Sequence, residues 1–361
     1  MPDQTANSPS STHEAIDAVV LWVDGHDPAW LAKRNRYLQG GEDRHDDIAG
    51  ATRYNSVGEV YYCLASINRF APFIRRIYLV TDHQVPPHLD DFLRHNFPEG
   101  YIPYEVVDHS VIFEGHDDCL PTFNCNSIES LLWRIPGLSE RYIYFNDDVV
   151  LLAPVSPDDF FVGEATCCYA RWYSTALARL LHALKPRREG HKPMGFKSLL
   201  VNTLRYTSPR RPWLRLRPSR LGHPSRLDGT YRSVRFLFLL HTPLPLRRSF
   251  FEHYFTAHPD VLRINIVQRF RHPSQFNPQE LFYLEEEREG RCLVISSHKN
   301  VFYYKPHAGG RYVERKAREF SRSKALFGCF NSLDQAAEDE RQQVLQWVAK
   351  RLKVDFDGMN T

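Results

Sequence analysis

Two adjacent carboxylates interrupt an apolar and aromatic run near the middle of the chain. The run Tyr142–Leu152, YIYFNDDVVLL, predicts a buried strand, and the acidic triplet Asn146, Asp147 and Asp148 follows its first half. Burying two neighbouring carboxylates costs several kcal/mol unless a cation compensates them. Oxygen ligands at the carboxyl end of a strand suit Mg²⁺ or Mn²⁺, and such a metal can hold a nucleotide diphosphate at the edge of an α/β sheet. The alternative is a solvated turn after an edge strand.

The elements that must position these carboxylates begin with a strand and a helix near the amino terminus. Residues Ile16–Val23 form a continuous apolar run that predicts a strand, and Asp24 and Gly25 follow it as a turn signal. Asp27 and Pro28 then predict the cap and the first residue of a helix. This order of elements is typical of an α/β fold.

A second helix and two more strands continue the β-α-β pattern. Ser56 and Glu59 predict a capping box at the start of a helix that ends before Pro72. The runs Arg76–Thr81 and Tyr104–Val107 predict the next two strands. Since parallel strands end at one edge of a sheet, we expect one crevice to gather the acidic residues that follow them: Asp24, Asp82, Asp147 and Asp148. The sequence has no GxGxxG or Walker-type loop, which disfavours dinucleotide binding and P-loop chemistry.

Composition predicts a globular cytoplasmic protein. The 361 residues are 42% hydrophobic and 25% charged, which is enough for a large core or two domains. Residues 1–14 are polar, lack the features of a signal peptide and predict a disordered tail. No apolar run approaches the roughly 20 residues that a membrane helix needs. The seven cysteines form no CxxC pair, as is typical of reduced thiols.

A basic segment precedes the last third of the chain. Between Lys185 and Arg235 there are fourteen Lys or Arg residues and only two acidic ones, with many prolines. We therefore predict a basic, irregular or partly helical insert within residues 166–240. A solvated loop is the plain interpretation. The charge also favours an anionic membrane surface or a polyanionic product as a partner, whereas nucleic acid is disfavoured because no recognition motif is present.

Several segments of the chain have patterns shared with known proteins. Three of them are IDAVVLWVDGHDPAW, RYNSVGEVYYCLASINRFAPFIRRIYLVTDHQVP and LPTFNCNSIESLLWRIPGLSERYIYFNDDVVLL. They resemble the first two sequence blocks of the Stealth family, whose members include bacterial capsular polysaccharide phosphotransferases and the catalytic part of N-acetylglucosamine-1-phosphotransferase. HTPLPLRRSFFEHYF and RFRHPSQFN resemble the third block, and LFGCFNSLDQA resembles the fourth more loosely. The resemblance covers most of residues 15–335.

The resemblance implies a transferase that moves a hexose 1-phosphate, such as GlcNAc-1-phosphate, from a UDP-sugar to a hydroxyl of an acceptor glycan. UMP would be released and a phosphodiester formed, in capsular or exopolysaccharide biosynthesis. It also implies a Rossmann-like, GT-A-like, mostly parallel sheet flanked by helices. Residues 15–165 would form the nucleotide-sugar-binding half, and residues 241–361 the rest of the catalytic domain with a carboxyl-terminal helix. The alternatives are a metal-dependent glycosyltransferase that releases UDP and a catalytically inactive glycan-binding relative.

The resemblance also implies roles for individual residues. His241 matches the family's catalytic histidine, although from the residues alone a strand-end histidine bonded to backbone is the commoner interpretation. Arg271 matches the essential arginine, and Asp148 is the third predicted catalytic residue. Asn146, Asp147 and Asp148 would bind Mg²⁺ or Mn²⁺. The predicted substrate-binding residues are Trp22, Asp24, Gly25, Arg53, Asn55, Asn124, Asn126, Glu129, Arg269 and Asn331. Trp22 could equally be a core residue.

The chain departs from the family pattern at two places. Ala65 stands where many relatives have arginine, so that a cationic contact is lost or supplied elsewhere. Asn331 is followed by Ser332 where the fourth block usually has Asp, and Asp334 is the nearest substitute carboxylate. Beyond it, apolar residues at helical spacing predict an amphipathic helix that packs on the body of the protein.

Overall fold

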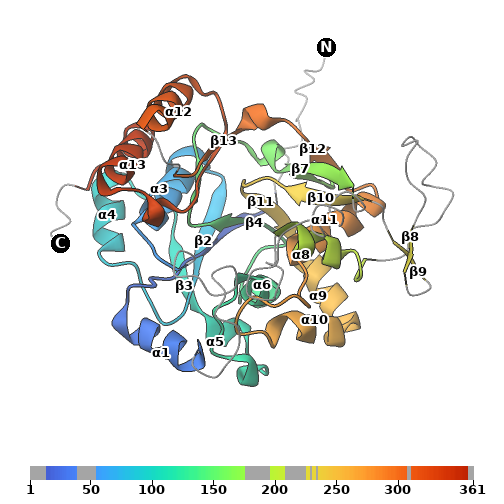
Figure 1. Ribbon diagram of the computed structural model, residues 1–361. Coiled ribbons are helices and arrows are strands. Elements are labelled where there is room, and N and C mark those ends of the chain that lie inside the picture. Colours follow the sequence, from blue (N-terminus) through green and yellow to red (C-terminus); the bar gives the residue numbers. More distant parts are fainter. Residues whose placement is uncertain are drawn as a thin grey trace, which may run out of the picture.

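The computed structural model describes residues 14–38, 54–174, 196–207, 225–227, 230–232, 235–306 and 310–356 (Figure 1). All but the last residue of the predicted amino-terminal tail lies outside this part of the chain. So do most of the basic segment Lys185–Arg235 and the predicted substrate-binding residue Arg53.

The centre of the molecule is a five-stranded, mostly parallel sheet. Its order is β11 (Leu244–Arg247), β4 (Arg141–Asn146), β1 (Ile16–Leu21), β2 (Ile74–Thr81) and β3 (Tyr104–Asp108). Only β11 runs antiparallel to its neighbour. β1 reads as a nearly unbroken apolar run because both of its faces are covered by protein. The predicted α/β fold with a mostly parallel Rossmann-like sheet is confirmed.

Helices flank this sheet (Figure 1). They are α1 (Pro28–Leu38), α3 (Glu59–Phe70), α4 (Leu89–Asn96), α5 (His109–Ile112), α6 (Cys125–Glu129), α8 (Phe196–Thr203), α9 (Arg248–Ala257), α10 (Pro259–Ile266), α11 (Pro278–Arg288), α12 (Gly310–Arg322) and α13 (Glu338–Leu352). The predicted start of α1 is confirmed, because the Asp27 carboxylate accepts hydrogen bonds from the amides of Ala29 and Trp30. The predicted packing of the last helix is confirmed by the burial of Val344, Val348 and Leu352.

The capping box predicted for Ser56 and Glu59 is wrong. α3 begins three residues later than expected, after Gly58, which has a left-handed backbone conformation with φ of 91°. The Glu59 carboxylate instead accepts a hydrogen bond from the Val57 amide at 2.7 Å. The Ser56 hydroxyl accepts one from the indole of Trp22 at 3.2 Å. Glycine at the helix start turns the chain without a side-chain cap, so Glu59 is held beside the helix terminus.

Three smaller sheets complete the described fold. One contains β10 (Arg235–Leu239), β7 (Ala165–Ser174) and β12 (Cys292–Ile295), with β6 (Phe161–Val162) beside β7. Another has the order β13 (Val301–Tyr304), β14 (Phe327–Phe330) and β5 (Val149–Leu151). The third is an antiparallel pair of β8 (Ser225–Leu227) and β9 (Thr230–Arg232). The single strand expected over Tyr142–Leu152 is therefore two strands, β4 and β5, which belong to different sheets.

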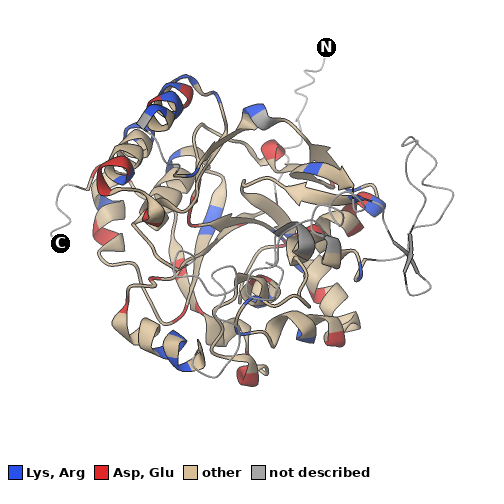
Figure 2. Cartoon of the chain, viewed as in Figure 1, with Lys and Arg blue, Asp and Glu red and all other residues tan. Residues whose placement is uncertain are grey.

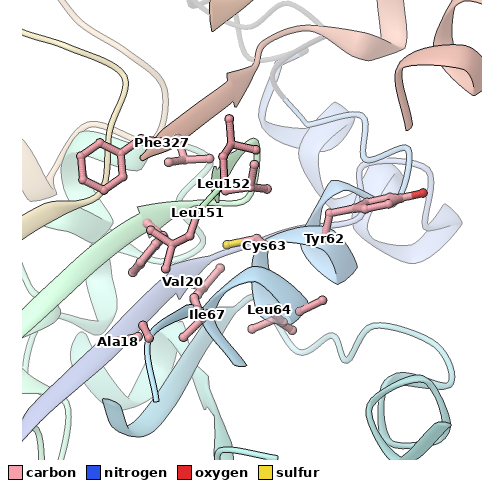
Figure 3. Packing of buried hydrophobic residues seen from close by; sticks show 14 of the residues in the cluster. Ala18, Val20, Tyr62, Cys63, Leu64, Ile67, Leu151, Leu152 and Phe327 are labelled. Carbon is pink, nitrogen blue, oxygen red and sulfur yellow. The ribbon is translucent and has the colours of Figure 1, made fainter. Parts of the chain in front are cut away.

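Apolar side chains fasten the central sheet to the β13-β14-β5 sheet. Figure 3 shows Val20 of β1, Cys63 of α3, Leu151 of β5 and Phe327 of β14 within one cluster, and all four are fully buried. Burying a large aliphatic or aromatic side chain stabilises a fold by about 1.5–3 kcal/mol. This cluster therefore holds the turn between β4 and β5 in a fixed place. Across the described residues, the helices are all too short or too polar to cross a lipid bilayer.

Candidate active site

The carboxyl ends of the parallel strands share one edge of the central sheet. Leu21 of β1 lies beside Asn146 of β4 on one side and Val80 of β2 on the other. Thr81 of β2 lies beside Asp108 of β3. The polar residues that end or follow β4, β1, β2 and β3 therefore emerge at the same edge, where ligands of open α/β sheets bind.

Asp148 lies where the central sheet meets the β13-β14-β5 sheet. Its backbone oxygen accepts a hydrogen bond from the Phe330 amide at 2.9 Å, because β14 pairs with β5. Its carboxylate accepts hydrogen bonds from the Asn331 side chain at 3.2 Å and from the Cys329 thiol at 3.6 Å. The structure thus brings together Asp148 and Asn331, two predicted site residues that are far apart in the sequence.

Further acidic side chains gather around Asp148. Loss of contact with water raises the pKa of Asp147 well above its usual range, and the nearby Glu59 and Asp148 carboxylates raise it further. Burial likewise raises the pKa of Glu59 to about 7, with further increases from Asp148 and Asp334. Asn55 donates a hydrogen bond to Asp334 at 3.2 Å, which links the start of α3 to the segment after β14. Sequence reasoning treated Glu59 only as a helix cap and missed its place in this cluster.

The chemistry of this acidic cluster fits a divalent cation. Within the described ranges, none of its carboxylates is in a salt bridge with Lys, Arg or His. An uncompensated group of carboxylate and amide oxygens is the donor set that Mg²⁺ and Mn²⁺ prefer. Asn146, Asp147 and Asp148 remain the predicted ligands.

A more compact acidic group lies at the ends of β2 and β3. Asp82, His83 and Asp108 have ligand atoms within 4.8 Å of one another. Each of them is already engaged with protein: Lys33 approaches Asp82 at 2.6 Å, and the His83 imidazole approaches Asp108 at 2.9 Å. The buried His109 beside them has its pKa lowered to about 4, chiefly by loss of water. We interpret this group as an internal network that fixes the ends of two strands.

His241 follows β10 and lies close enough to the acidic cluster for the charge of Asp148 to act on its pKa. Its ring centroid lies 5.2 Å from that of Tyr303 in β13, and its side chain retains contact with solvent. Surrounding protein removes part of its hydration and lowers the pKa of His241. The Asp148 carboxylate opposes this decrease, whereas the Lys305 ammonium adds to it. The net decrease in pKa favours the neutral form of the imidazole.

Arg271 lies in a second polar group beside Asn146. Its guanidinium donates a hydrogen bond to the Cys125 thiol at 3.0 Å and lies near the Glu129 carboxylate. Glu129 accepts a hydrogen bond from the Tyr144 hydroxyl at 2.9 Å, and that hydroxyl also lies 2.7 Å from Asn146. Burial raises the pKa of Glu129, while Arg271 partly offsets the increase. These contacts connect Arg271 to the end of β4.

The loop after β1 is fixed by contacts from two neighbouring segments. The backbone of Asp24 exchanges two hydrogen bonds with the Gln84 side chain, at 2.9 and 3.0 Å. The Gly25 amide donates to the Tyr54 carbonyl at 2.7 Å, so the two backbones almost touch. Trp22 is buried in the core as well as bonded to Ser56. The Asp24 carboxylate remains partly exposed at the sheet edge.

Of three further predicted substrate-binding residues, two use their side-chain donors within the protein and one does not. The Asn124 amide is buried and donates to the carbonyls of residues 268 and 270 and to Gln275, which anchors α6. Arg269 donates to the carbonyls of Asp118 and Leu120 at 3.1 and 3.0 Å. The buried amide nitrogen of Asn126 has no hydrogen-bond partner among the described residues. Asn126 therefore stays a predicted ligand donor, while Asn124 and Arg269 position the backbone.

Two segments of the chain match conserved regions of known proteins. Residues 14–42 match conserved region 1 of the Stealth proteins, and residues 53–168 match their conserved region 2. The second region contains Glu59, Glu129 and the Asp147–Asp148 pair.

Similar proteins extend the match beyond these regions. The chain is 34% identical over 269 residues to the capsular polysaccharide phosphotransferase WcwK of Streptococcus pneumoniae, which covers 73% of this chain and 75% of that protein. It is 33% identical, with the same coverage, to the receptor polysaccharide phosphotransferase WefC of Streptococcus oralis. A match of 31% identity to the exopolysaccharide phosphotransferase cps2G of Lactiplantibacillus plantarum covers 80% of this chain and 85% of that one.

Two solved structures of glycosyltransferases have only a weak similarity to the fold of this chain. The bifunctional glycosyltransferase WbbM overlaps with a TM-score of 0.41 at 12% identity, over 95% of this chain and 51% of that one. The galactosyltransferase LgtC, crystallised with donor and acceptor sugar analogues, overlaps with a TM-score of 0.36 at 11% identity, over 92% of this chain and 95% of that one. The fold described above therefore rests on the strand order and register of this chain.

Proposed function

This chain belongs to the Stealth family, and on that premise we propose that it transfers a hexose 1-phosphate from a UDP-sugar to a hydroxyl of an acceptor glycan. Its relatives bear the names of capsular, receptor and exopolysaccharide phosphotransferases, which supports a transferase acting in polysaccharide biosynthesis. The finer part of the proposal is that GlcNAc-1-phosphate or a similar group moves, and that UMP is released. A cytoplasmic location near the inner face of the membrane stays a prediction.

The proposal rests chiefly on one observation: carboxylates, an amide and an imidazole lie around Asp148. Three distant segments supply it with neighbours: Glu59 from the start of α3, Asn331 from the end of β14 and His241 from the end of β10. Phosphoryl transfer asks a protein mainly for positioning and charge stabilisation. The carboxylate and amide oxygens can stabilise charge through a bound cation, and the neutral imidazole can position the acceptor hydroxyl.

Asn146, Asp147 and Asp148 would hold Mg²⁺ or Mn²⁺ at the carboxyl end of β4. Such an ion, when bound, neutralises charge on the donor diphosphate. Asn331 holds the Asp148 carboxylate in place through its amide, and Asp334 stands on the same segment in place of the carboxylate that Ser332 lacks. Asn55 fixes Asp334 in turn.

His241 is the base in this proposal. An acceptor hydroxyl oxygen attacks the phosphorus that bears the sugar, and its proton passes to the neutral imidazole. The bond from that phosphorus to the UMP oxygen breaks, while the anomeric bond remains intact. The lowered pKa of His241 favours the neutral form that can accept a proton.

Arg271 is proposed to bind oxygens of the transferred phosphate. A guanidinium can form two parallel hydrogen bonds to a phosphate, which a lysine cannot. Cys125 accepts a hydrogen bond from one nitrogen of Arg271, and Glu129 lies near the same group. Cys125 and Glu129 therefore orient the guanidinium rather than react.

The released nucleotide tests the proposal. The protein is incubated with Mg²⁺, a panel of UDP-sugars and capsule oligosaccharides, and the products are examined by phosphorus NMR and nucleotide chromatography. We expect stoichiometric UMP and a new phosphodiester resonance. Stoichiometric UDP would instead assign the protein to the glycosyltransferases, and no turnover with any donor and acceptor would favour a glycan-binding role.

A further inference from the structure

Four arginines form a straight row along α12. Arg311, Arg315, Arg318 and Arg322 are spaced by four, three and four positions, and all four side chains are exposed. At 3.6 residues per turn this spacing places them on one face of the helix, over about 16 Å of its length. Figure 2 shows Lys and Arg positions, in blue, along α12 at the edge of the molecule. We call this row the arginine stripe.

The opposite face of α12 packs against the core. Val313 and Phe320 are buried, and the Lys316 ammonium lies over the ring of Phe302 at 5.1 Å. The Tyr312 ring lies 5.8 Å from that of Tyr304 in β13. Because its apolar side is used within the fold, α12 offers only charged and polar groups to a partner.

The charges of the arginine stripe are not matched by carboxylates. In the portion of the chain that the structure describes, none of the four arginines forms a salt bridge. Glu319 pairs with Lys316 at 3.0 Å, and Arg318 approaches only the backbone carbonyl of Glu314, at 3.4 Å. Four neighbouring guanidinium groups without counter-charges attract a ligand that carries several anionic groups in a line.

β13 connects the arginine stripe to the candidate active site. Tyr304, which contacts Tyr312 of α12, is followed by Lys305, whose charge acts on His241. The preceding Tyr303 is partly exposed and lies against the His241 ring. An anionic chain bound along the stripe would therefore have one end near Tyr303, an exposed ring that offers an apolar face and a hydroxyl group.

We propose that the arginine stripe binds the phosphodiester-containing glycan chain on which the enzyme acts. This inference rests on the proposed function, because each transfer leaves one negative charge in the product. An anionic membrane is a less suitable partner for the arginine stripe. Glu314 and Glu319 flank the row on both sides and would be repelled by a flat anionic surface, and α12 exposes no large apolar side chain that could enter the bilayer. A bound chain raises the effective concentration of its end at the active site.

The test compares two double variants with equal net charge. Arg315→Gln with Arg318→Gln removes the middle of the stripe, whereas Arg76→Gln with Arg94→Gln removes two exposed charges from β2 and α4. The probes are a synthetic oligosaccharide with four phosphodiester-linked repeats, its uncharged glycosidic counterpart and a single-repeat acceptor. Calorimetry measures binding of the charged oligosaccharide without turnover, and initial rates give kcat and KM for each acceptor.

For the stripe variant we expect about tenfold weaker binding of the charged oligosaccharide and a similar rise in its KM, from the loss of two exposed charge contacts. Its kcat, its KM for the single repeat and its donor KM should not change, and the control variant should match the wild type. Equal weakening in both variants would overturn the inference. So would loss of binding to phosphatidylglycerol vesicles with unchanged oligosaccharide binding, which would assign the stripe to a membrane.

The same measurements separate this inference from the proposed function. If the wild type releases UMP and forms phosphodiesters but the stripe variant binds the charged oligosaccharide normally, only the stripe inference fails. If the wild type neither transfers a sugar phosphate nor binds the charged oligosaccharide, both proposals fail.

Discussion

At the scale of single residues, Asp148 is the residue to which most of the other groups of the candidate site are connected. Its backbone is fixed by Phe330, its carboxylate by Asn331 and Cys329, and other carboxylates crowd around it. A carboxylate held by neutral donors and surrounded by like charge keeps its affinity for a cation.

We expect Asp148→Ala to reduce turnover at least a hundredfold, as is typical when a charge-stabilising group is lost. Excess EDTA should abolish activity, and Mg²⁺ or Mn²⁺ should restore it. Initial rates of UMP release measure both effects, with Asp158→Ala, an exposed aspartate outside the cluster, as the control. Full activity in EDTA would contradict the metal site.

Substitution of His241 distinguishes an effect on donor binding from an effect on the rate of transfer. Because donor binding does not need the proposed base, His241→Ala should leave UDP-sugar affinity nearly unchanged while the transfer rate falls by roughly 10² to 10⁴. Calorimetry gives the affinity and chromatography of UMP gives the rate. His253→Ala, on the exposed side of α9, provides the matched histidine control. Wild-type turnover of His241→Ala would remove the proposed base.

At the scale of elements, the loop after β1 is held by a close approach of two backbones. A Cβ atom added at Gly25 would lie 2.4 Å from the Tyr54 carbonyl oxygen, so no side chain fits without movement. Gly25 therefore fixes the distance between the β1 loop and the segment that leads into α3, where Asn55 and Glu59 lie.

Gly25→Ala should lower the free energy of unfolding by about 1–3 kcal/mol, the usual cost of crowding a packed site. It should also raise the donor KM, because the loop that carries the predicted substrate-binding residues Trp22, Asp24 and Gly25 moves away from the start of α3. Urea denaturation and initial rates measure the two effects. The neighbouring exposed His26→Ala should change the free energy of unfolding little, and equal effects of both substitutions would contradict the close-approach argument.

The sequence predicted those elements whose pattern is local. β1 and β2 were predictable because strands covered on both faces read as apolar runs, and α1 because Asp27 and Pro28 mark its start. β3 has a weaker pattern, because it is an edge strand and Val107 is its one buried residue. The division between β4 and β5 was not, since an apolar run does not reveal that its two halves join different sheets. The contact of Asn331 with Asp148 spans 183 positions and depends on β14 pairing with β5.

At the scale of the whole molecule, a buried acid couples stability to pH. Glu280 of α11 is fully buried, and its carboxyl accepts a hydrogen bond from the Leu237 amide in β10 at 3.0 Å. Burial raises the pKa of Glu280 well above its usual range, despite hydrogen bonds that oppose the increase. The folded protein therefore keeps this proton at pH values where the unfolded chain has released it.

Stability from this group is complete below the unfolded pKa of about 4.3 and is lost as the pH rises toward the folded pKa. Glu280→Gln keeps an acceptor for Leu237 and removes the proton. We expect its Tm to exceed that of the wild type by more at pH 8 than at pH 5, as measured by calorimetry. Glu99→Gln, an exposed control, should show the same difference at both pH values. A difference for Glu280→Gln that does not depend on pH would contradict this coupling.

The pairing of β14 with β5 joins two segments that the ribosome makes at different times. A ribosome adds about 5–20 residues per second, so Asn331 emerges on the order of ten to forty seconds after Asp148. During that interval the nascent chain carries the acidic turn without the strand that fixes it. A growing chain that has not yet reached β14 therefore lacks the contacts from Phe330 and Asn331 that fix the backbone and the carboxylate of Asp148.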